Sequence, residues 1–293
     1  MSSERPVRTP IEIDPALLAT HPELAVLTLD LPDSDGEPME NERERLQMLL
    51  LLDALEQYWR GRQDFYAAGN MFVYYSAQQA RQILAEEAEP ERPRHAFRGP
   101  DLFVVLHVDG SFRRQKWVVW DEEGHYPDVI FEFLSPSTRR TDQTTKKTLY
   151  EQIFKTREYY WYDPFDPREF QGWHLDLNNG YQAMIPDSRG CMWSPTLHLW
   201  IGHWEGTYLS DPATWLRFYD PHGQLVLTSQ ETAEAAEQRA AAAEVELARL
   251  RAELARLRGE SESPTQSDVA RHLDAEMLSM QGVTGLTFPP WGC

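Results

Sequence analysis

One apolar run in the middle of the chain contains a carboxylate, and this combination constrains the fold more than any other feature. The run is Val129-Ile-Phe-Glu-Phe-Leu134, and it ends at the turn residues Ser135-Pro136. Its short, continuous apolar pattern predicts a buried strand. An unpaired carboxylate would be costly there, so Glu132 needs a partner, either a metal cation or an arginine such as Arg98 or Arg113.

Similar patterns on both sides of this run predict an α/β or α+β domain over residues 39–222. Helices are expected over 41–60 and 146–155, strands over 71–75, 101–108, 116–120 and 159–162, and shorter strands around Trp173, Tyr181 and 197–200. The charged, proline-interrupted stretch 81–98 indicates a loop instead. Residues 1–38, rich in Pro, Asp and Glu, indicate a flexible N-terminal arm.

Residues 228–258 follow a different period. Alanines and then leucines recur at alternating steps of three and four residues, which is the a/d seam of a coiled coil: Ala233, Ala236, Ala240, Ala243, Leu247, Leu250, Leu254 and Leu257. The residues at the g and e′ positions pair opposite charges, namely Arg239/Glu244, Glu246/Arg251 and Glu253/Arg258. This pattern favours a parallel homodimer through 228–258, while a single exposed helix laced by i,i+4 pairs is the alternative. Residues 259–293 are expected to form a flexible tail.

Composition limits the classes of function. The chain has 293 residues and a formal net charge of −19, which argues against a strong, general nucleic-acid binder but permits a local basic patch. The two cysteines, Cys191 and Cys293, have no zinc-like spacing and give no disulfide framework. No apolar stretch suits secretion or a membrane span, so we expect a soluble, cytoplasmic protein with no membrane partner.

Three separated residues, Asp101, Glu132 and Lys146, stand where a metal-dependent nuclease would need them. Asp101 opens an apolar run, Glu132 interrupts another, and Lys146 follows in a polar stretch. Two carboxylates can bind a hard cation such as Mg²⁺ or Mn²⁺ through oxygen, and a nearby ammonium can orient a water and stabilise developing negative charge. Each residue alone is more often structural, as a strand-entry Asp, an ion-paired Glu or a solvated Lys.

Longer motifs around these residues resemble a known family. They are Gly99-Pro-Asp101, Tyr126-Pro-Asp-Val-Ile-Phe-Glu-Phe-Leu-Ser-Pro-Ser-Thr138, Asp142-x-x-x-Lys146-x-x-x-Tyr150 and Glu158-Tyr-Tyr-Trp-Tyr-Asp-Pro164. Over roughly residues 40–215 the chain resembles the Uma-two family of the PD-(D/E)xK nuclease-like superfamily. The resemblance implies a restriction-endonuclease-like core with a central mixed sheet flanked by helices, a metal held by Asp101 and Glu132, and hydrolysis of phosphodiester bonds.

The chain departs from the superfamily pattern at the lysine. The position two residues after Glu132 is Leu134, and the resemblance places a migrated lysine at Lys146 on the following helix. The i,i+4 spacing puts Lys146 and Tyr150 on one helix face, while Lys147 is the alternative if the helix register differs.

Other side chains are weaker candidates. Asp128 lies on the same side of an ideal strand as Glu132, but its position favours a role in strand entry. Ser135 and Ser137 have no histidine at a position that would indicate a serine hydrolase. One of Glu40, Glu42 and Glu44 could add a carboxylate from the first helix, although a solvated face is the more common role. Arg139 and Arg140 could contact phosphate. The aromatic residues favour a place in the core over a base-stacking role: Trp117, Trp120, Tyr159, Tyr160 and Trp161.

The sequence therefore predicts a Mg²⁺-dependent DNA endonuclease in which Asp101 and Glu132 bind the metal and Lys146 positions the water. A dimer would place two single-strand-cutting sites on one duplex. The alternative is a catalytically silent protein of nuclease fold that acts as a binding or scaffold module through its coiled coil. The negative charge favours that alternative, and the intact triad favours the enzyme.

Overall fold

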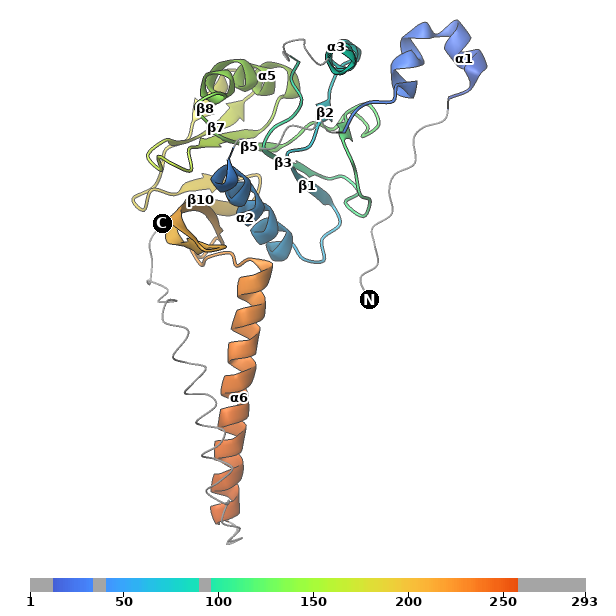
Figure 1. Cartoon of the computed structure of the whole chain (residues 1–293). Coiled ribbons are helices and arrows are strands. Elements are labelled where there is room, and N and C mark those ends of the chain that lie inside the picture. The colour runs from blue at the N-terminus through green and yellow to red at the C-terminus, as the bar shows by residue number, and fades with distance from the viewer. Residues whose placement is uncertain (1–12, 34–40, 90–95, 258–293) are drawn as a thin grey trace. The chain divides into compact units, whose positions relative to one another are not determined.

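The computed structural model describes residues 13–33, 41–89 and 96–257. These residues divide into two compact units, one ending at Thr228 and the other beginning at Ser229. The first unit is an α/β domain built on a mixed sheet, and the second contains the long helix α6 (Figure 1). None of the helices in the described part of the chain combines the length and apolar character that crossing a membrane requires.

The central sheet has six strands in the order β1-β3-β5-β6-β7-β8. They are β1 (Phe65–Gly69), β3 (Leu102–Leu106), β5 (Val129–Phe133), β6 (Glu158–Tyr162), β7 (Phe170–Asp176) and β8 (Gly180–Ala183). The β5–β6 pair is parallel and the other four pairs are antiparallel. The expectation of a central mixed sheet flanked by helices is confirmed.

Helix α2 (Glu42–Tyr58) covers one face of this sheet (Figure 1). It begins at Asn41, whose side chain caps the first turn by accepting a hydrogen bond from the Glu44 backbone N–H at 2.9 Å. Its apolar side packs on the alternate residues of β5 that face it, Val129, Phe131 and Phe133. Because side chains alternate along a strand, Ile130 and Glu132 face the other way.

A helix over residues 139–154 covers that other face and is the crossover that a parallel strand pair needs (Figure 1). It contains α4 (Arg139–Thr141), a wide π turn η2 (Asp142–Lys146), α5 (Lys147–Leu149) and a second π turn η3 (Tyr150–Phe154). It ends at Lys155, which has a left-handed backbone with φ of 54°. Tyr150 and Phe154 are buried against the sheet with Ile130 and Tyr159.

A second, antiparallel sheet extends the core beneath α2. Its strands are β9 (Met192–Ser194), β10 (Leu199–Tyr208) and β11 (Asp211–Tyr219), in the order β11-β10-β9. Gln47 of α2 is buried and joins the helix to β11, because its side chain donates to the Leu216 carbonyl at 2.9 Å and accepts from the Leu216 N–H at 2.8 Å. These contacts fix α2 on the face away from Glu132.

A smaller layer surrounds the parallel pair of β2 (Val73–Tyr74) and β4 (Trp117–Val118). Helix α3 (Ala77–Ala88) packs on it through Ala80 and Ile83, and the prediction of a loop over 81–98 was wrong for this part. The Ser76 side chain caps the helix by accepting from the Gln79 N–H at 3.1 Å, a signal that the charged residues obscured. Residues 90–95 lie outside the described ranges.

The segment 13–33 is more ordered than an arm rich in Pro, Asp and Glu indicated. It contains α1 (Pro15–Thr20) and a 3-10 helix η1 (Pro22–Thr28). Leu31 is buried in the layer around β2 and β4, and the Tyr74 hydroxyl donates to the Pro32 carbonyl at 2.7 Å. The remaining residues of the predicted arm, 1–12 and 34–38, lie outside the described ranges, as does the predicted tail 259–293.

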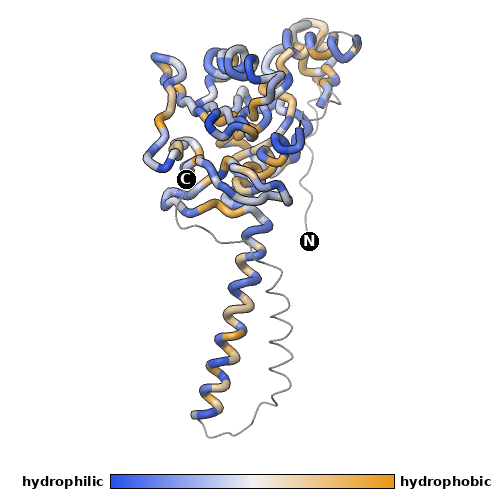
Figure 2. Tube along the Cα trace, turned by 60° about the vertical axis from the view of Figure 1, so that its left-hand side comes forward, coloured by the Kyte–Doolittle hydropathy of each residue, from blue (hydrophilic) through white to orange (hydrophobic). Residues whose placement is uncertain are grey.

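Helix α6 (Ser229–Leu257) forms over the stretch that has the coiled-coil pattern. Polar and apolar residues alternate along it in Figure 2. The side chains of Val245, Leu247, Leu250 and Leu254 are about half exposed or more, at 60, 49, 48 and 52%. Of these, Leu247, Leu250 and Leu254 belong to the predicted a/d seam, so this part of the seam is half exposed in the described chain.

Candidate active site

The register of two antiparallel strands brings Asp101 and Glu132 together. Leu102 of β3 pairs with Phe131 of β5, so Asp101, one residue before Leu102, comes opposite Glu132. The Phe133 N–H donates to Asp101 Oδ2 at 2.6 Å, and the Asp101 N–H lies 3.4 Å from Glu132 Oε2. Two carboxylates that are 31 residues apart in the sequence thus share one end of the strand pair.

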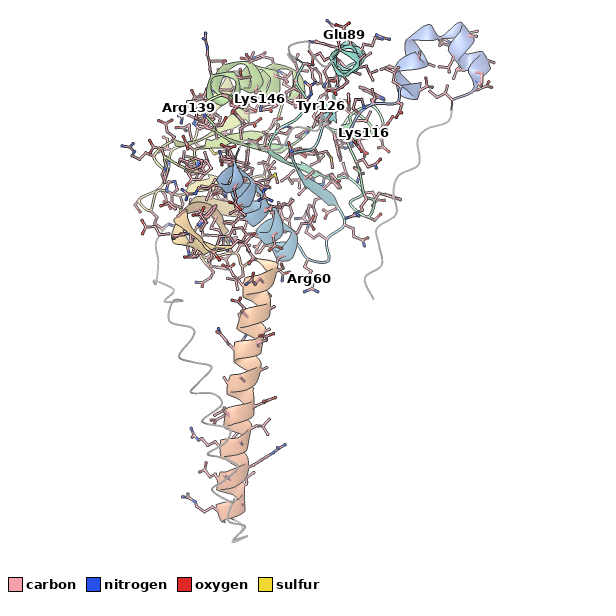
Figure 3. The ribbon with its side chains drawn as sticks, viewed as in Figure 1. Arg60, Glu89, Lys116, Tyr126, Arg139 and Lys146 are labelled. Atoms are coloured by element: carbon pink, nitrogen blue, oxygen red, sulfur yellow. The ribbon has the colours of Figure 1, made fainter. Side chains whose placement is uncertain are left out.

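Lys146 lies on the helix over the sheet (Figure 3). Its side chain reaches the same two carboxylates from there. Its Nζ lies 3.0 Å from Glu132 Oε2 and 2.9 Å from Asp142 Oδ1, one helical turn earlier. The Lys146 side chain is 18% exposed, whereas those of Glu132 and Asp142 are 0 and 1% exposed. Lys146 is therefore the most exposed of these three side chains.

Tyr150 completes the surroundings of Glu132. Its hydroxyl donates to Glu132 Oε1 at 2.5 Å, and the ring is fully buried between Phe97, Phe154 and Tyr159. One carboxylate oxygen is thus held by a hydroxyl donor and the other by the ammonium. This arrangement fixes the Glu132 side chain in a single orientation.

Burial and crowding set the charges of the cluster. Burial raises the pKa of Glu132 well above its ordinary value, against the opposing effect of Lys146, and the neighbouring Asp101 raises it further. Burial also raises the pKa of Asp101. Burial alone would lower the pKa of Lys146, but Glu132, Asp142 and Asp101 outweigh it and raise that pKa. Lys146 is therefore a permanent cation and not a base near neutral pH.

The donor set fits a hard divalent cation. In the described ranges, no group of three or more His, Cys, Asp or Glu side chains is arranged to hold a metal on its own. Mg²⁺ is commonly held by only one or two carboxylates, with waters and substrate phosphates as its other ligands. With all four groups ionised, the three carboxylates exceed the one ammonium by two negative charges. A divalent cation between Asp101 and Glu132 would compensate that excess and relieve their repulsion.

A model of the Uma2 family, described as "Putative restriction endonuclease", matches residues 35–202, more than half of the chain. The chain belongs to the Uma2 family. Its mixed sheet and flanking helices agree with the restriction-endonuclease-like superfamily that the resemblance implied.

One solved structure similar to this Uma2 protein is described as "a putative nuclease belonging to DUF820 from Anabaena variabilis ATCC 29413". The two chains are 12% identical, with a TM-score of 0.38, and the match covers 58% of this chain and 88% of the other. A comparison with curated proteins gave no match.

The structure separates the two neighbouring lysines of this Uma2 protein. Lys146 contacts the carboxylates, whereas the Lys147 ammonium lies 3.9 Å from the centre of the Trp173 ring and 5.8 Å from that of Trp161. Lys147 therefore faces the aromatic surface of β6 and β7. The geometry favours Lys146 as the lysine of the site.

The arginines that could have neutralised Glu132 are elsewhere. Arg98 forms ion pairs with Glu86 and Glu87 of α3, at 3.2 and 2.9 Å. Arg113 is exposed. The buried carboxylate thus has a lysine and a tyrosine, and no arginine, as its side-chain partners among the described residues.

The additional carboxylates lie away from the cluster. Glu42 and Glu44 belong to α2, on the opposite face of the sheet, and Glu40 lies outside the described residues. Asp128 stands at the beginning of β5, where it accepts from the Leu106 N–H at 2.8 Å and pairs with Arg157 at 3.1 Å. Asp128 therefore fixes the entry of the strand, as its position in the sequence indicated.

The turn after β5 is held together by its own hydroxyl groups. Ser135 Oγ lies 3.0 Å from Thr138 Oγ1 and 3.2 Å from Ser137 Oγ. Arg139 lies at the start of the helix (Figure 3) and forms ion pairs with Asp163 and Glu169. Arg139 is thus engaged by two carboxylates, whereas Arg140 is exposed to solvent.

Asp142 and Tyr150 are residues of the site to which the sequence motifs alone gave no role. Both stand four residues from Lys146, one before it and one after it. In an α-helix such residues drift around the axis by about 40° per step, and the wider π turns counteract that drift. The spacing of four predicted Lys146 and Tyr150 on one face, and the same spacing before Lys146 was the signal that could have added Asp142.

Proposed function

We propose that this Uma2 protein is a divalent-cation-dependent endonuclease that hydrolyses phosphodiester bonds of DNA. The observation that carries the proposal is the cluster of Asp101, Glu132 and Lys146 at one end of the β3–β5 pair, in which Glu132 is fully buried and the other two are partly buried. A structural ion pair would need only one carboxylate for one ammonium. Here Asp101, Glu132 and Asp142 surround one ammonium, and a divalent cation would favour the ionised carboxylates that burial alone disfavours.

Each residue has a distinct part in this reaction. Asp101 and Glu132 would hold Mg²⁺ or Mn²⁺, and a divalent cation supplies a nucleophilic water at neutral pH and offsets charge on the phosphate. Tyr150 holds Glu132 Oε1, so Oε2 is the oxygen directed towards the centre of the cluster. The Lys146 ammonium orients the water and stabilises the negative charge that develops on the phosphate oxygens as water adds to phosphorus and the bond to one sugar oxygen breaks.

The test is cleavage of supercoiled plasmid and of single-stranded DNA with Mg²⁺, with Mn²⁺ or with a chelator. Glu132→Gln and Lys146→Ala should each reduce cleavage by about 10²–10³-fold, the usual effect of losing one preorganised charge. Lys147→Ala is the matched control, because its ammonium lies over Trp173 and should leave cleavage unchanged. Cleavage that is absent in the wild-type protein, or equal in Glu132→Gln, would refute the assignment.

We also propose that two copies associate through α6 as a parallel coiled coil. The half-exposed Leu247, Leu250 and Leu254 support it, because burying them in a second copy removes apolar surface from water. Association would place two single-strand-cutting sites on one duplex. Sedimentation should show a dimer that Leu250→Glu converts to a monomer, while Ala252→Glu, on the outward face of the heptad, leaves it dimeric. A wild-type monomer would contradict this proposal.

A further inference from the structure

Asp142 is a buried carboxylate beside the site that the catalytic scheme above does not use. Its side chain is 1% exposed, and its Oδ1 lies 2.9 Å from Lys146 Nζ. The same ammonium lies 3.0 Å from Glu132 Oε2. Lys146 is therefore shared between a carboxylate on the helix and a carboxylate on the sheet.

The backbone of Asp142 is fixed on both sides. Its N–H donates to the Thr138 carbonyl at 3.0 Å, and its carbonyl accepts from the buried Tyr159 hydroxyl at 3.0 Å. Tyr159 belongs to β6, the strand beside β5, so Asp142 is tied to the same sheet that carries Glu132. The wide turn η2 begins at Asp142 and ends at Lys146, and π turns of this kind are frequent at functional sites.

A purely structural role does not explain this carboxylate. The pair of Lys146 and Glu132 is already complete without it, and Asp142 adds negative charge that raises the pKa of Glu132 further. Its second oxygen, Oδ2, is buried and accepts no hydrogen bond from the residues that the structure describes. Buried polar atoms without partners carry a free-energy cost, and proteins keep few of them.

We propose that Asp142 is a positioning residue that holds the Lys146 ammonium beside the cation site. This inference rests on the proposed function. With Asp142 present, Lys146 has a second anchor, so the ammonium can give up Glu132 Oε2 when a cation binds. With Asp142 neutralised, Glu132 is the nearest anion to the ammonium, so Lys146 competes with the cation for the same oxygen.

The test is a double-mutant cycle of Asp142→Asn and Lys146→Met, read by Mn²⁺ titration calorimetry and by plasmid nicking. Asp142→Asn should lower Mn²⁺ affinity and nicking by about 10–100-fold, the usual effect of losing a residue that orients a ligand. The double variant should regain Mn²⁺ affinity, because the competing ammonium is gone, and it should nick no more slowly than Lys146→Met alone. Glu151→Gln, on the same helix, should match the wild-type protein in both measurements, because Glu151 bonds the Tyr181 N–H instead.

A third measurement needs neither the cation nor DNA. The rate at which acetic anhydride modifies Lys146, followed by peptide mass spectrometry, should rise in Asp142→Asn and stay unchanged in Glu151→Gln. If the wild-type protein cleaves no DNA, the proposed function fails. The two remaining measurements, Mn²⁺ affinity and the rate of Lys146 acetylation, still test whether Asp142 positions Lys146. Unchanged affinity and acetylation in Asp142→Asn, or nicking losses that add to those of Lys146→Met, would overturn the inference. If circular dichroism shows that Asp142→Asn does not fold, Asp142→Ser replaces it in all three measurements.

Discussion

Replacing Gly99 with alanine should displace Asp101, and the size of the effect follows from one contact. A Cβ on Gly99 would lie 2.1 Å from the Met71 carbonyl oxygen, whereas real Cβ contacts essentially never fall below 3.0 Å. The backbone must therefore separate by at least 0.9 Å, the difference between these distances. The partner is backbone and cannot rotate away, so the segment that leads into β3 has to move.

That segment carries Asp101 and is tied to its neighbour by two hydrogen bonds. The Val73 N–H donates to the Arg98 carbonyl at 2.6 Å, and the Asn70 N–H donates to the Asp101 carbonyl at 2.8 Å. Overpacking of this kind costs about 1–3 kcal/mol of stability. A misplacement near 1 Å at a reacting centre costs about 10²-fold in rate. We expect Gly99→Ala to show both losses.

Gly110→Ala is the matched control, because a Cβ there would lie 2.0 Å from the Phe65 carbonyl oxygen. Gly110 follows β3 at the end away from Asp101, so its variant should lose similar stability without the specific loss of nicking. Urea unfolding by tryptophan fluorescence gives the stabilities, and Mn²⁺ titration and plasmid nicking follow under conditions where both variants are folded. Wild-type stability in Gly99→Ala, or equal nicking in the two variants, would refute the reasoning.

Two further predictions concern the surroundings of the site, and a third concerns α2 on the opposite face of the sheet. Tyr150→Phe removes the donor to Glu132 Oε1 and should cost about 1.5–3 kcal/mol in urea unfolding, and an unchanged midpoint would contradict that hydrogen bond. Because burial raises the pKa of Glu132 and Asp101, the cation-free fold favours their protonated forms. The free energy of unfolding should therefore be greatest below the ordinary pKa values of 4.5 and 3.8, and it should fall as the pH rises through the raised pKa values. Unfolding in chelator across pH should show this decline, and an equal slope in Glu132→Gln would exclude Glu132 as its source. Gln47→Leu leaves both backbone groups of Leu216 without their partner and should cost about 1–3 kcal/mol for each, with nicking per folded molecule unchanged because α2 lies on the opposite face.

The sequence pattern predicted the helices and strands in which apolar residues are continuous or recur with a clear period. The strand around Glu132 and the helix that became α2 are examples, because a continuous or periodic apolar pattern needs no knowledge of the partner. β1 was missed and α3 was predicted as a loop. Phe65–Gly69 is a strand because β3 pairs with its whole length, and α3 is a helix because Ala80 and Ile83 have a small apolar layer to enter.

The strand predicted over residues 116–120 shows the same limit. Only Trp117 and Val118 form β4, since β2 offers a pairing partner of just two residues. Similarly, β10 begins at Leu199 and not at Leu197, because His198 has a left-handed backbone with φ of 56°. The length of a short strand is set by its neighbour and by the turn before it, and neither is visible in the apolar pattern.

The sequence by itself determined that a carboxylate lies in a buried strand, that it needs a partner, and that a long heptad helix follows the domain. The tertiary structure decided which groups meet it. The β3–β5 register places Asp101 opposite Glu132, and the π turns bring Asp142, Lys146 and Tyr150 to one face while Lys147 turns to Trp173. The physical reason is that burial and periodicity are local properties of the chain, whereas the pairing of buried charges depends on strand register and helix rotation, which are fixed only when the whole core packs.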